Sequence, residues 1–154
     1  MKKTNFFSRV RQQMAFTMIE LLIVIAILGI LAGLAIPRFL DATATARGAR
    51  IVADMRTIDS AIVIYNAKTG SLPTITGTDY SVLTTDDNAN GKYQLLAAWP
   101  VPPTGTAKIT NNAGKTVTIT SATAYSYGGA TGTNAGRALY GTLTVDGILA
   151  LTGE

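Results

Sequence analysis

The sequence predicts an α+β fold in which a long N-terminal helix packs on a small antiparallel β-sheet. An uninterrupted apolar run occupies residues 16–37 apart from one carboxylate near its start. Residues 38–70 repeat apolar side chains at helical spacing. From Ala107 onward the apolar period falls to two residues, which is typical of strands. A helical part followed by a run of strands belongs to the α+β class.

The N-terminal region has the length and charge of a membrane segment. The uncharged run Leu21–Ile36 would span about 24 Å as a helix, and residues 16–37 about 33 Å, close to the ~30 Å of a bilayer core. Residues 1–15 hold basic side chains and no acid: Lys2, Lys3, Arg9 and Arg11. The positive-inside rule leaves this end in the cytoplasm and exports the rest. A cleaved secretory signal peptide and a plain signal anchor are alternative interpretations.

The carboxylate near the start of the apolar run is Glu20. A charge inside a membrane segment costs about 2.5–3.5 kcal/mol on insertion scales, so it is seldom found there without a partner. The position of Glu20 therefore predicts assembly with other copies of the chain. The alternative is a glutamate that extends to the lipid headgroups and has no partner.

The segment Phe16-Thr17-Met18-Ile19-Glu20-Leu21-Leu22, with the apolar run to Pro37, resembles the N-terminus of type IV pilins and type II secretion pseudopilins. The resemblance implies that residues 1–15 are a leader and that a prepilin peptidase cuts between Ala15 and Phe16. It also implies N-methylation of Phe16, an assembly role for Glu20, and an end of the membrane portion at Pro37. The family usually has Gly before the cut; since Ala15 is the next smallest residue, we expect cleavage to persist, though more slowly.

Cleavage would expose a positive α-amine at Phe16, which can neutralise Glu20 of a neighbouring copy. Leaving one member of such a pair alone is costly, so pairing fixes the register of helices that otherwise slide past one another. Gly29 and Gly33 form a small-xxx-small pair. This pair is either a helix-packing face or a weak point ahead of Pro37, although glycines are also simply common in membrane helices.

Residues 38–70 are predicted to form an amphipathic continuation of the same helix. Five apolar side chains at 4-3-4-3 spacing predict one buried face, called the core stripe below: Ile51, Met55, Ile58, Ile62 and Tyr65. A coiled-coil seam is the alternative, but the pattern is barely two heptads long. The small residues of 41–49 suit either close packing between helices of a filament or a loosely packed exposed helix. Thr69-Gly70 predicts the helix stop.

Residues 71–154 are predicted to form a globular head with a loop region and an antiparallel sheet. We expect a short helix at Tyr93–Ala98 and a turn at Asn111–Gly114. Four strands are expected, at residues 108–110, 116–120, 123–127 and 139–145. The last is expected to point Leu139, Leu143 and Val145 inward and Tyr140, Thr142 and Thr144 outward.

The loop Asp86-Asp87-Asn88-Ala89-Asn90-Gly91 fits the first half of a calcium-binding loop, with Asp86, Asn88 and Asn90 as candidate ligands. Ala97 occupies the position where a bidentate glutamate should close the site. A polar surface turn is the alternative and the favoured interpretation, so we expect no metal and no other cofactor.

The composition argues against an enzyme. The chain has no Cys and no His, which excludes thiol nucleophiles, Ser-His-Asp triads, ordinary zinc sites and a disulfide within the exported domain. Four of the 13 basic residues lie in the leader, and the rest balance the 9 acidic residues. The positive net charge thus reflects orientation in the membrane, and we expect no direct nucleic-acid partner.

We therefore expect a structural subunit of a type IV pilus-like filament that serves adhesion, motility or DNA uptake. The resemblance implies as partners further copies of the chain, a prepilin peptidase, and an inner-membrane assembly platform with its ATPase. It implies a single-pass inner-membrane protein that later enters a cell-surface pilus. One alternative is a pseudopilin of a type II secretion system, in a periplasmic pseudopilus. A second alternative is a membrane-anchored exported binding domain.

Overall fold

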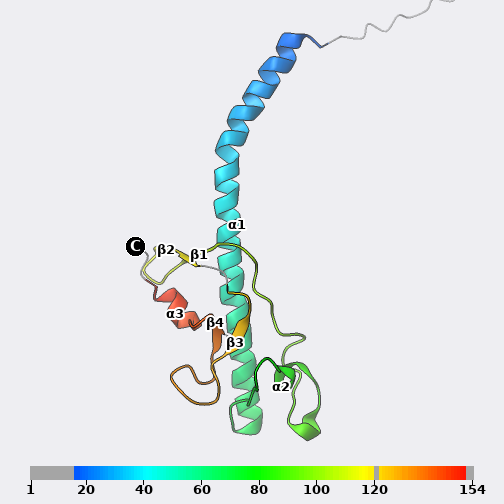
Figure 1. Cartoon of the computed structure of the whole chain (residues 1–154), viewed down its shortest axis with the longest axis vertical. Coiled ribbons are helices and arrows are strands. Elements are labelled where there is room, and N and C mark those ends of the chain that lie inside the picture. Colours follow the sequence, from blue (N-terminus) through cyan, green and yellow to red (C-terminus); the bar gives the residue numbers. More distant parts are fainter. Residues whose placement is uncertain (1–15, 120–121, 152–154) are drawn as a thin grey trace, which may run out of the picture. The chain divides into compact units, whose positions relative to one another are not determined.

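The structure, a computed structural model, describes residues 16–119 and 122–151 (Figure 1). Its elements in chain order are α1 Met18–Thr69, α2 Ser81–Thr84, the 3-10 helix η1 Asn88–Asn90, β1 Ala107–Thr110, β2 Thr116–Ile119, β3 Tyr125–Tyr127, β4 Ala138–Tyr140 and α3 Val145–Leu149. The predicted α+β class, a long N-terminal helix with small antiparallel sheets, is confirmed. The chain forms two compact units, residues 1–38 and residues 39–154, and the second is called the head unit below.

Local chemistry sets both ends of α1. Thr17 precedes the first helical residue, and its hydroxyl oxygen accepts the N–H of Glu20 at 3.2 Å, as an N-cap residue does. At the other end Gly70 adopts φ 75°, and its N–H donates to the Asn66 carbonyl at 2.8 Å. A left-handed residue just after the last turn favours glycine. The helix stop predicted at Thr69-Gly70 is confirmed.

The core of the head unit is built on one face of α1. All five residues of the core stripe are buried, none of them more than 8% exposed, so the predicted buried face is confirmed. Buried side chains from the rest of the head unit complete the core: Leu83, Leu96, Ala107, Ile109, Ile119, Tyr125, Ala138, Tyr140, Val145 and Ile148. Each large apolar side chain contributes about 1.5–3 kcal/mol when it is fully buried, so this face holds the head unit together.

The strands β1 and β2 form a hairpin whose turn is organised by a buried asparagine. The Oδ1 atom of Asn111 accepts the N–H groups of Ala113 at 3.0 Å and Lys115 at 2.8 Å, which closes the turn. Its Nδ2 atom donates to the carbonyl of Leu151 at 2.6 Å. The predicted turn at Asn111–Gly114 is confirmed, and the same side chain ties the C-terminal segment to the hairpin.

The strand β1 approaches α1 at a glycine. A Cβ atom on Gly48 would overlap the carbonyl oxygen of Lys108 and the side chain of Ile109. Ala44, one turn earlier, is also buried. Two polar contacts fasten the same place: Arg47 Nη1 donates to the Thr106 carbonyl at 2.9 Å, and Lys108 Nζ lies 2.7 Å from Asp41 Oδ1. The small residues of 41–49 therefore admit a strand of the same chain, a use that the sequence did not reveal.

The expected single sheet is wrong, because the strands form two separate pairs, β1–β2 and β3–β4. The expected facing of the last strand is reversed at Leu139 and Tyr140, whereas Val145 is buried and Thr142 exposed as expected. Tyr140 is 3% exposed and Leu139 is only half-buried. A tyrosine ring carries a large apolar surface that packs inward readily, and the Tyr140 ring lies 5.8 Å from that of Tyr125. The pattern had counted tyrosine as an outward-facing residue.

The strand expected to continue to residue 145 ends at Tyr140. Gly141 follows with φ 66°, and the chain then enters α3. Thr144 caps this helix, since its hydroxyl accepts the Gly147 N–H at 3.1 Å. Val145 and Ile148 point into the core at helical spacing, which explains why a run of alternating residues folds as a helix here.

The helix expected at Tyr93–Ala98 is also wrong. The N–H groups of Leu95 and Leu96 donate to the Leu83 carbonyl at 2.9 and 3.0 Å, so this segment is bound to α2 and does not coil. The short helix is α2 itself, which buries Leu83 completely.

Candidate functional site

Glu20 and Thr17 form a capping box at the start of α1. The Oε2 atom of Glu20 accepts the Thr17 backbone N–H at 2.9 Å and the Thr17 hydroxyl at 2.8 Å. In return the Thr17 hydroxyl oxygen accepts the Glu20 N–H. This reciprocal arrangement satisfies two of the N–H groups that a helix start leaves without partners. The sequence contains the Thr-x-x-Glu signature of a capping box. The prediction for Glu20 used only its charge and not this signature.

The carboxylate is held on one side only. Both hydrogen bonds use Oε2, and Oε1 has no hydrogen-bond partner among the residues that the structure describes. The capping box fixes where the carboxylate lies and leaves one oxygen for a further donor. The predicted donor is the amine of Phe16 on another copy, and the structure describes one copy.

The apolar run that follows Glu20 is unburied. Its large side chains are between 45% and 68% exposed from Leu21 to Ile36. By length and composition, α1 contains a segment able to cross a membrane, and a signal sequence near an N-terminus passes the same test. Contiguous apolar surface of this extent requires lipid or protein to cover it.

Gly29, Gly33 and Pro37 follow one another at four-residue spacing and so lie on one side of α1. No described residue lies within 4 Å of a Cβ placed on either glycine, so no contact within the described part of the chain requires glycine there. Pro37 lies inside the helix and has no N–H to offer the Gly33 carbonyl. One hydrogen bond of the regular helical pattern is therefore missing between Gly33 and Pro37.

Phe16 begins the described part of the chain and is 80% exposed. Ala15 and the expected leader, residues 1–15, lie outside the described residues. The expected cleavage between Ala15 and Phe16 stays a prediction.

The structure brings together two of the three candidate calcium ligands and not the third. Asn90 Nδ2 donates to Asp87 Oδ2 at 2.7 Å, whereas Asp86 and Asn88 line a separate small hollow beside Lys68. Among the described residues no group of three or more carboxylate, His or Cys side chains could hold a metal. The loop is organised by its own backbone: Asp87 and Lys92 form a bridge with N···O distances of 3.0 and 3.1 Å.

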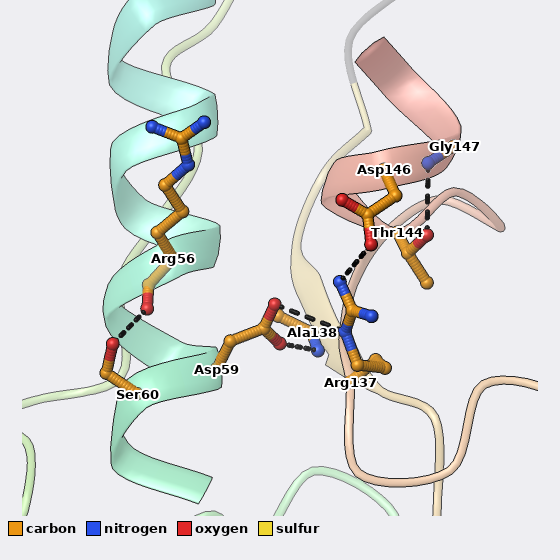
Figure 2. Close-up of polar contacts among 8 residues, drawn as sticks. All are labelled: Arg56, Asp59, Ser60, Arg137, Ala138, Thr144, Asp146 and Gly147. Atoms are coloured by element: carbon orange, nitrogen blue, oxygen red, sulfur yellow. Dashed lines mark hydrogen bonds and ion pairs between the residues drawn. The ribbon is translucent and has the colours of Figure 1, made fainter. Parts of the chain in front are cut away.

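A polar contact that sequence reasoning missed joins three parts of the head unit (Figure 2). Asp59 on α1 accepts the Ala138 backbone N–H through Oδ1 at 2.6 Å and the Arg137 Nε–H through Oδ2 at 3.4 Å. The Arg137 Nη2 atom donates to Asp146 Oδ2 on α3 at 2.9 Å. This set, Asp59, Arg137 and Asp146, is called the clasp below. It fixes the start of β4 and the start of α3 to α1.

A second missed contact centres on Tyr125, which is completely buried. Its hydroxyl donates to Asp54 Oδ2 at 3.0 Å, and its carbonyl accepts from Trp99 Nε1 at 3.1 Å and from the Tyr80 hydroxyl at 3.3 Å. Burial, together with the bond to Asp54, raises the pKa of the Tyr125 hydroxyl. Arg50 Nε lies 3.6 Å from Asp54 Oδ2, one turn earlier on α1 and beside this contact.

Residues 11–36 match a family model described as the prokaryotic N-terminal methylation motif. The chain is 44% identical over 59 residues to the type IV narrow pilus major component PilA5 of Thermus thermophilus, which covers 38% of this chain and 51% of that protein. It is 34% identical over 91 residues to a fimbrial protein of Pseudomonas aeruginosa, covering 55% and 59% of the two chains.

The chain is also 38% identical over 81 residues to the type IV major pilin protein PilE1 of Neisseria gonorrhoeae, covering 53% of this chain and 48% of that protein. The chain thus spans about half the length of the curated relatives it matches. No solved structure gives a significant match. The resemblance drawn from residues 16–37 is confirmed by the motif match and by these relatives.

Proposed function

Because this chain carries the prepilin methylation motif and its curated relatives are type IV pilins and fimbrial proteins, we propose that it is a structural subunit of a type IV pilus. The observation that carries the proposal is the bare apolar surface of Leu21–Ile36 with Glu20 positioned at its start. The surface drives helices together or into lipid, and the carboxylate selects their register.

The proposed register depends on the amine of Phe16. Once the leader is removed, that amine carries a positive charge close to the bilayer. On a neighbouring copy, Glu20 Oε1 can accept a hydrogen bond from this amine, and the capping box stays intact because it uses Oε2. A helix one turn out of register would leave both charges without partners at a cost of several kcal/mol, and this cost discriminates against the wrong assembly.

The proposed subunit begins as a single-pass protein of the cytoplasmic membrane and ends in a surface filament. Its proposed partners are further copies of itself, a prepilin peptidase that cuts after Ala15, and a membrane platform driven by an ATPase. Adhesion, motility and DNA uptake are the proposed roles of the filament. Structural subunits of this kind need no catalytic residues.

A pseudopilin of a type II secretion system is the second candidate. The exit from α1, where Leu72 and a buried Pro73 follow the helix end, resembles the pattern of pilins and pseudopilins and suits this candidate. A pseudopilin would share the membrane helix and Glu20 but would remain in the periplasm.

The test is to shear producing cells, image the released material and weigh its subunit by intact mass spectrometry. Long filaments whose subunit mass equals residues 16–154 plus one methyl group support the pilin. The same mature mass retained in the membrane, without filaments, supports the pseudopilin. An uncleaved chain contradicts both.

Substitutions at Glu20 separate its two roles. Glu20→Gln keeps a side chain that completes a capping box, whereas Glu20→Ala removes it. Both variants are expected to be inserted and processed, and neither is expected to assemble, because neither carries the charge. Thr17→Val is the matched control, since it removes the cap and keeps the carboxylate. Normal filaments from Glu20→Gln would contradict the proposed charge pairing.

A further inference from the structure

Among the described residues of the head unit, two charged side chains have no interaction partner. Among its described residues, the other carboxylates have partners: Asp41 with Lys108, Asp54 with Arg50 and Tyr125, Asp59 and Asp146 with Arg137, Asp79 with the Ser81 N–H, and Asp87 with Asn90. Asp86 is exposed and has no hydrogen bond or ion pair to any described residue.

The described cations of the head unit also have partners, with one exception. Arg47 donates to a carbonyl, Lys68 lies 5.3 Å from the centre of the Tyr93 ring, Lys92 lies within electrostatic range of Asp79, and Lys115 is also engaged. The guanidinium of Arg56 is exposed and makes no hydrogen bond or ion pair with the described part of the chain. Figure 2 shows it pointing away from the neighbouring contact of Asp59 with Arg137.

Arg56 stands at the edge of a groove of about 350 Å³ that has an apolar floor. Val52 on α1, Ile109 on β1 and Leu149 on α3 form that floor, and Lys108 lines the same groove. Asp86 lines a different hollow, together with Lys68 near the end of α1. Lys68 lies twelve positions after Arg56 on α1, which is about 18 Å along the helix. Arg56 and Asp86 of one chain therefore cannot meet.

We propose that Arg56 of one copy binds Asp86 of another, with the loop around Asp86 seated in the groove of Val52, Ile109 and Leu149. The occupant is a second copy because Asp86 is a carboxylate without a partner among the described residues, and Arg56 is a cation of the groove in the same state. Ala89, exposed three residues after Asp86, supplies an apolar contact for the floor. The inference rests on the proposed function, which supplies many copies side by side.

The geometry of this contact has a consequence for the assembly. In a filament each copy offers its groove to one neighbour and its Asp86 loop to another, so the contact is heterologous. Repetition of a heterologous contact that does not close a ring produces an open helical filament. The groove thus provides contact between head units in addition to the contact between membrane helices, and it fixes which copies are neighbours.

The first test is charge reversal. Arg56→Glu and Asp86→Arg are each expected to lower the yield of sheared filaments about tenfold or more, because each places like charges together. The double variant restores opposite charges and is expected to recover the yield. Thr131→Glu with Thr133→Glu is the matched control, since it changes the net charge by the same two units as Arg56→Glu, in an exposed loop.

Normal filaments from either single variant would overturn the pairing. Failure of both singles without recovery in the double variant would also overturn it. Loss in Arg56→Glu with normal assembly of Asp86→Arg would assign the groove to another anionic partner and refute Asp86 as the occupant.

The second test does not depend on filaments. The chain contains no Cys, so Arg56→Cys and Asp86→Cys can be introduced together and treated with a short bismaleimide in intact membranes. A ladder of cross-linked copies is expected from the double variant and not from either single variant. If unaltered chains form no filaments but the ladder appears, the proposed function fails and the head contact stands. Filaments without the ladder would refute the head contact alone.

Discussion

The clasp gives the sharpest prediction about stability, because its three members differ in burial. Asp59 accepts a backbone N–H at 2.6 Å, and its side chain is 21% exposed. Asp59→Ala leaves the Ala138 N–H without an acceptor at the start of β4 and separates Arg137 from α1. A charge-assisted hydrogen bond to a partly buried group contributes about 1.5–3 kcal/mol, so we expect a loss of about 2–3 kcal/mol in the free energy of unfolding.

Substitutions of Arg137 and Asp146 should lower the free energy of unfolding by less than Asp59→Ala does. Arg137→Met leaves Asp59 bonded to the Ala138 N–H and keeps the aliphatic part of the side chain, so the expected loss is about 1 kcal/mol. The Asp146 side chain is 77% exposed, and Asp146→Asn should cost less than about 0.5 kcal/mol. The order is therefore Asp59→Ala, then Arg137→Met, then Asp146→Asn.

The assay is urea unfolding of the full chain in detergent, monitored by the fluorescence of Trp99. Trp99 is the chain's one tryptophan, and its Nε1–H donates to the carbonyl of the buried Tyr125 in β3, so its emission reports the head unit. Asp59→Asn is the matched control, since it keeps an acceptor for Ala138 and removes the charge. An Asp146→Asn variant as unstable as Asp59→Ala, or an Asp59→Ala variant within ~0.5 kcal/mol of the parent chain, would refute the reasoning.

Two further predictions use the same fluorescence measurement. Gly48→Ala is expected to destabilise the head unit by about 1–3 kcal/mol, because the new Cβ meets the Lys108 backbone. A glycine-to-alanine substitution in an open helix interior usually stabilises a protein. A stabilised Gly48→Ala variant would therefore contradict the close approach of β1 to α1. Tyr125→Phe is expected to cost about 1 kcal/mol at pH 7 through the lost bond to Asp54. Because folding raises the pKa of Tyr125, its contribution is complete below about pH 10 and is lost as the pH rises further, so the difference between Tyr125→Phe and the parent chain should narrow at alkaline pH. Parallel pH profiles would argue against this.

The core stripe and the helix stop could be predicted because each depends on neighbours within a few positions. Helical spacing selects Ile51 through Tyr65 as one face, and Gly70 ends the helix through its own backbone freedom. The turn at Asn111 is local in the same sense. The Thr-x-x-Glu signature at the start of α1 could also have predicted the capping box, but the unusual charge drew the interpretation toward a partner on another copy.

The features that escaped prediction are non-local or chemically ambiguous. Asp59 and Arg137 are 78 positions apart, and no spacing rule links them. Gly48 has no distinguishing neighbours, and its need for a bare Cα arises only when β1 lies against it. Tyr140 is apolar in its ring and polar at its tip, so alternation alone cannot say which way it faces.

The clasp and the Asn111 side chain hold the C-terminal segment by hydrogen bonds and ion pairs, beside the buried Val145 and Ile148, in a sequence without cysteine. The final geometry of the head unit is therefore reached at the rate of folding and needs no oxidant or thiol exchange. It should be the same in reducing and oxidising surroundings. A head unit unfolded by heat should refold without mispaired disulfides. One subunit can therefore be extended and refolded repeatedly without any change in its covalent bonds.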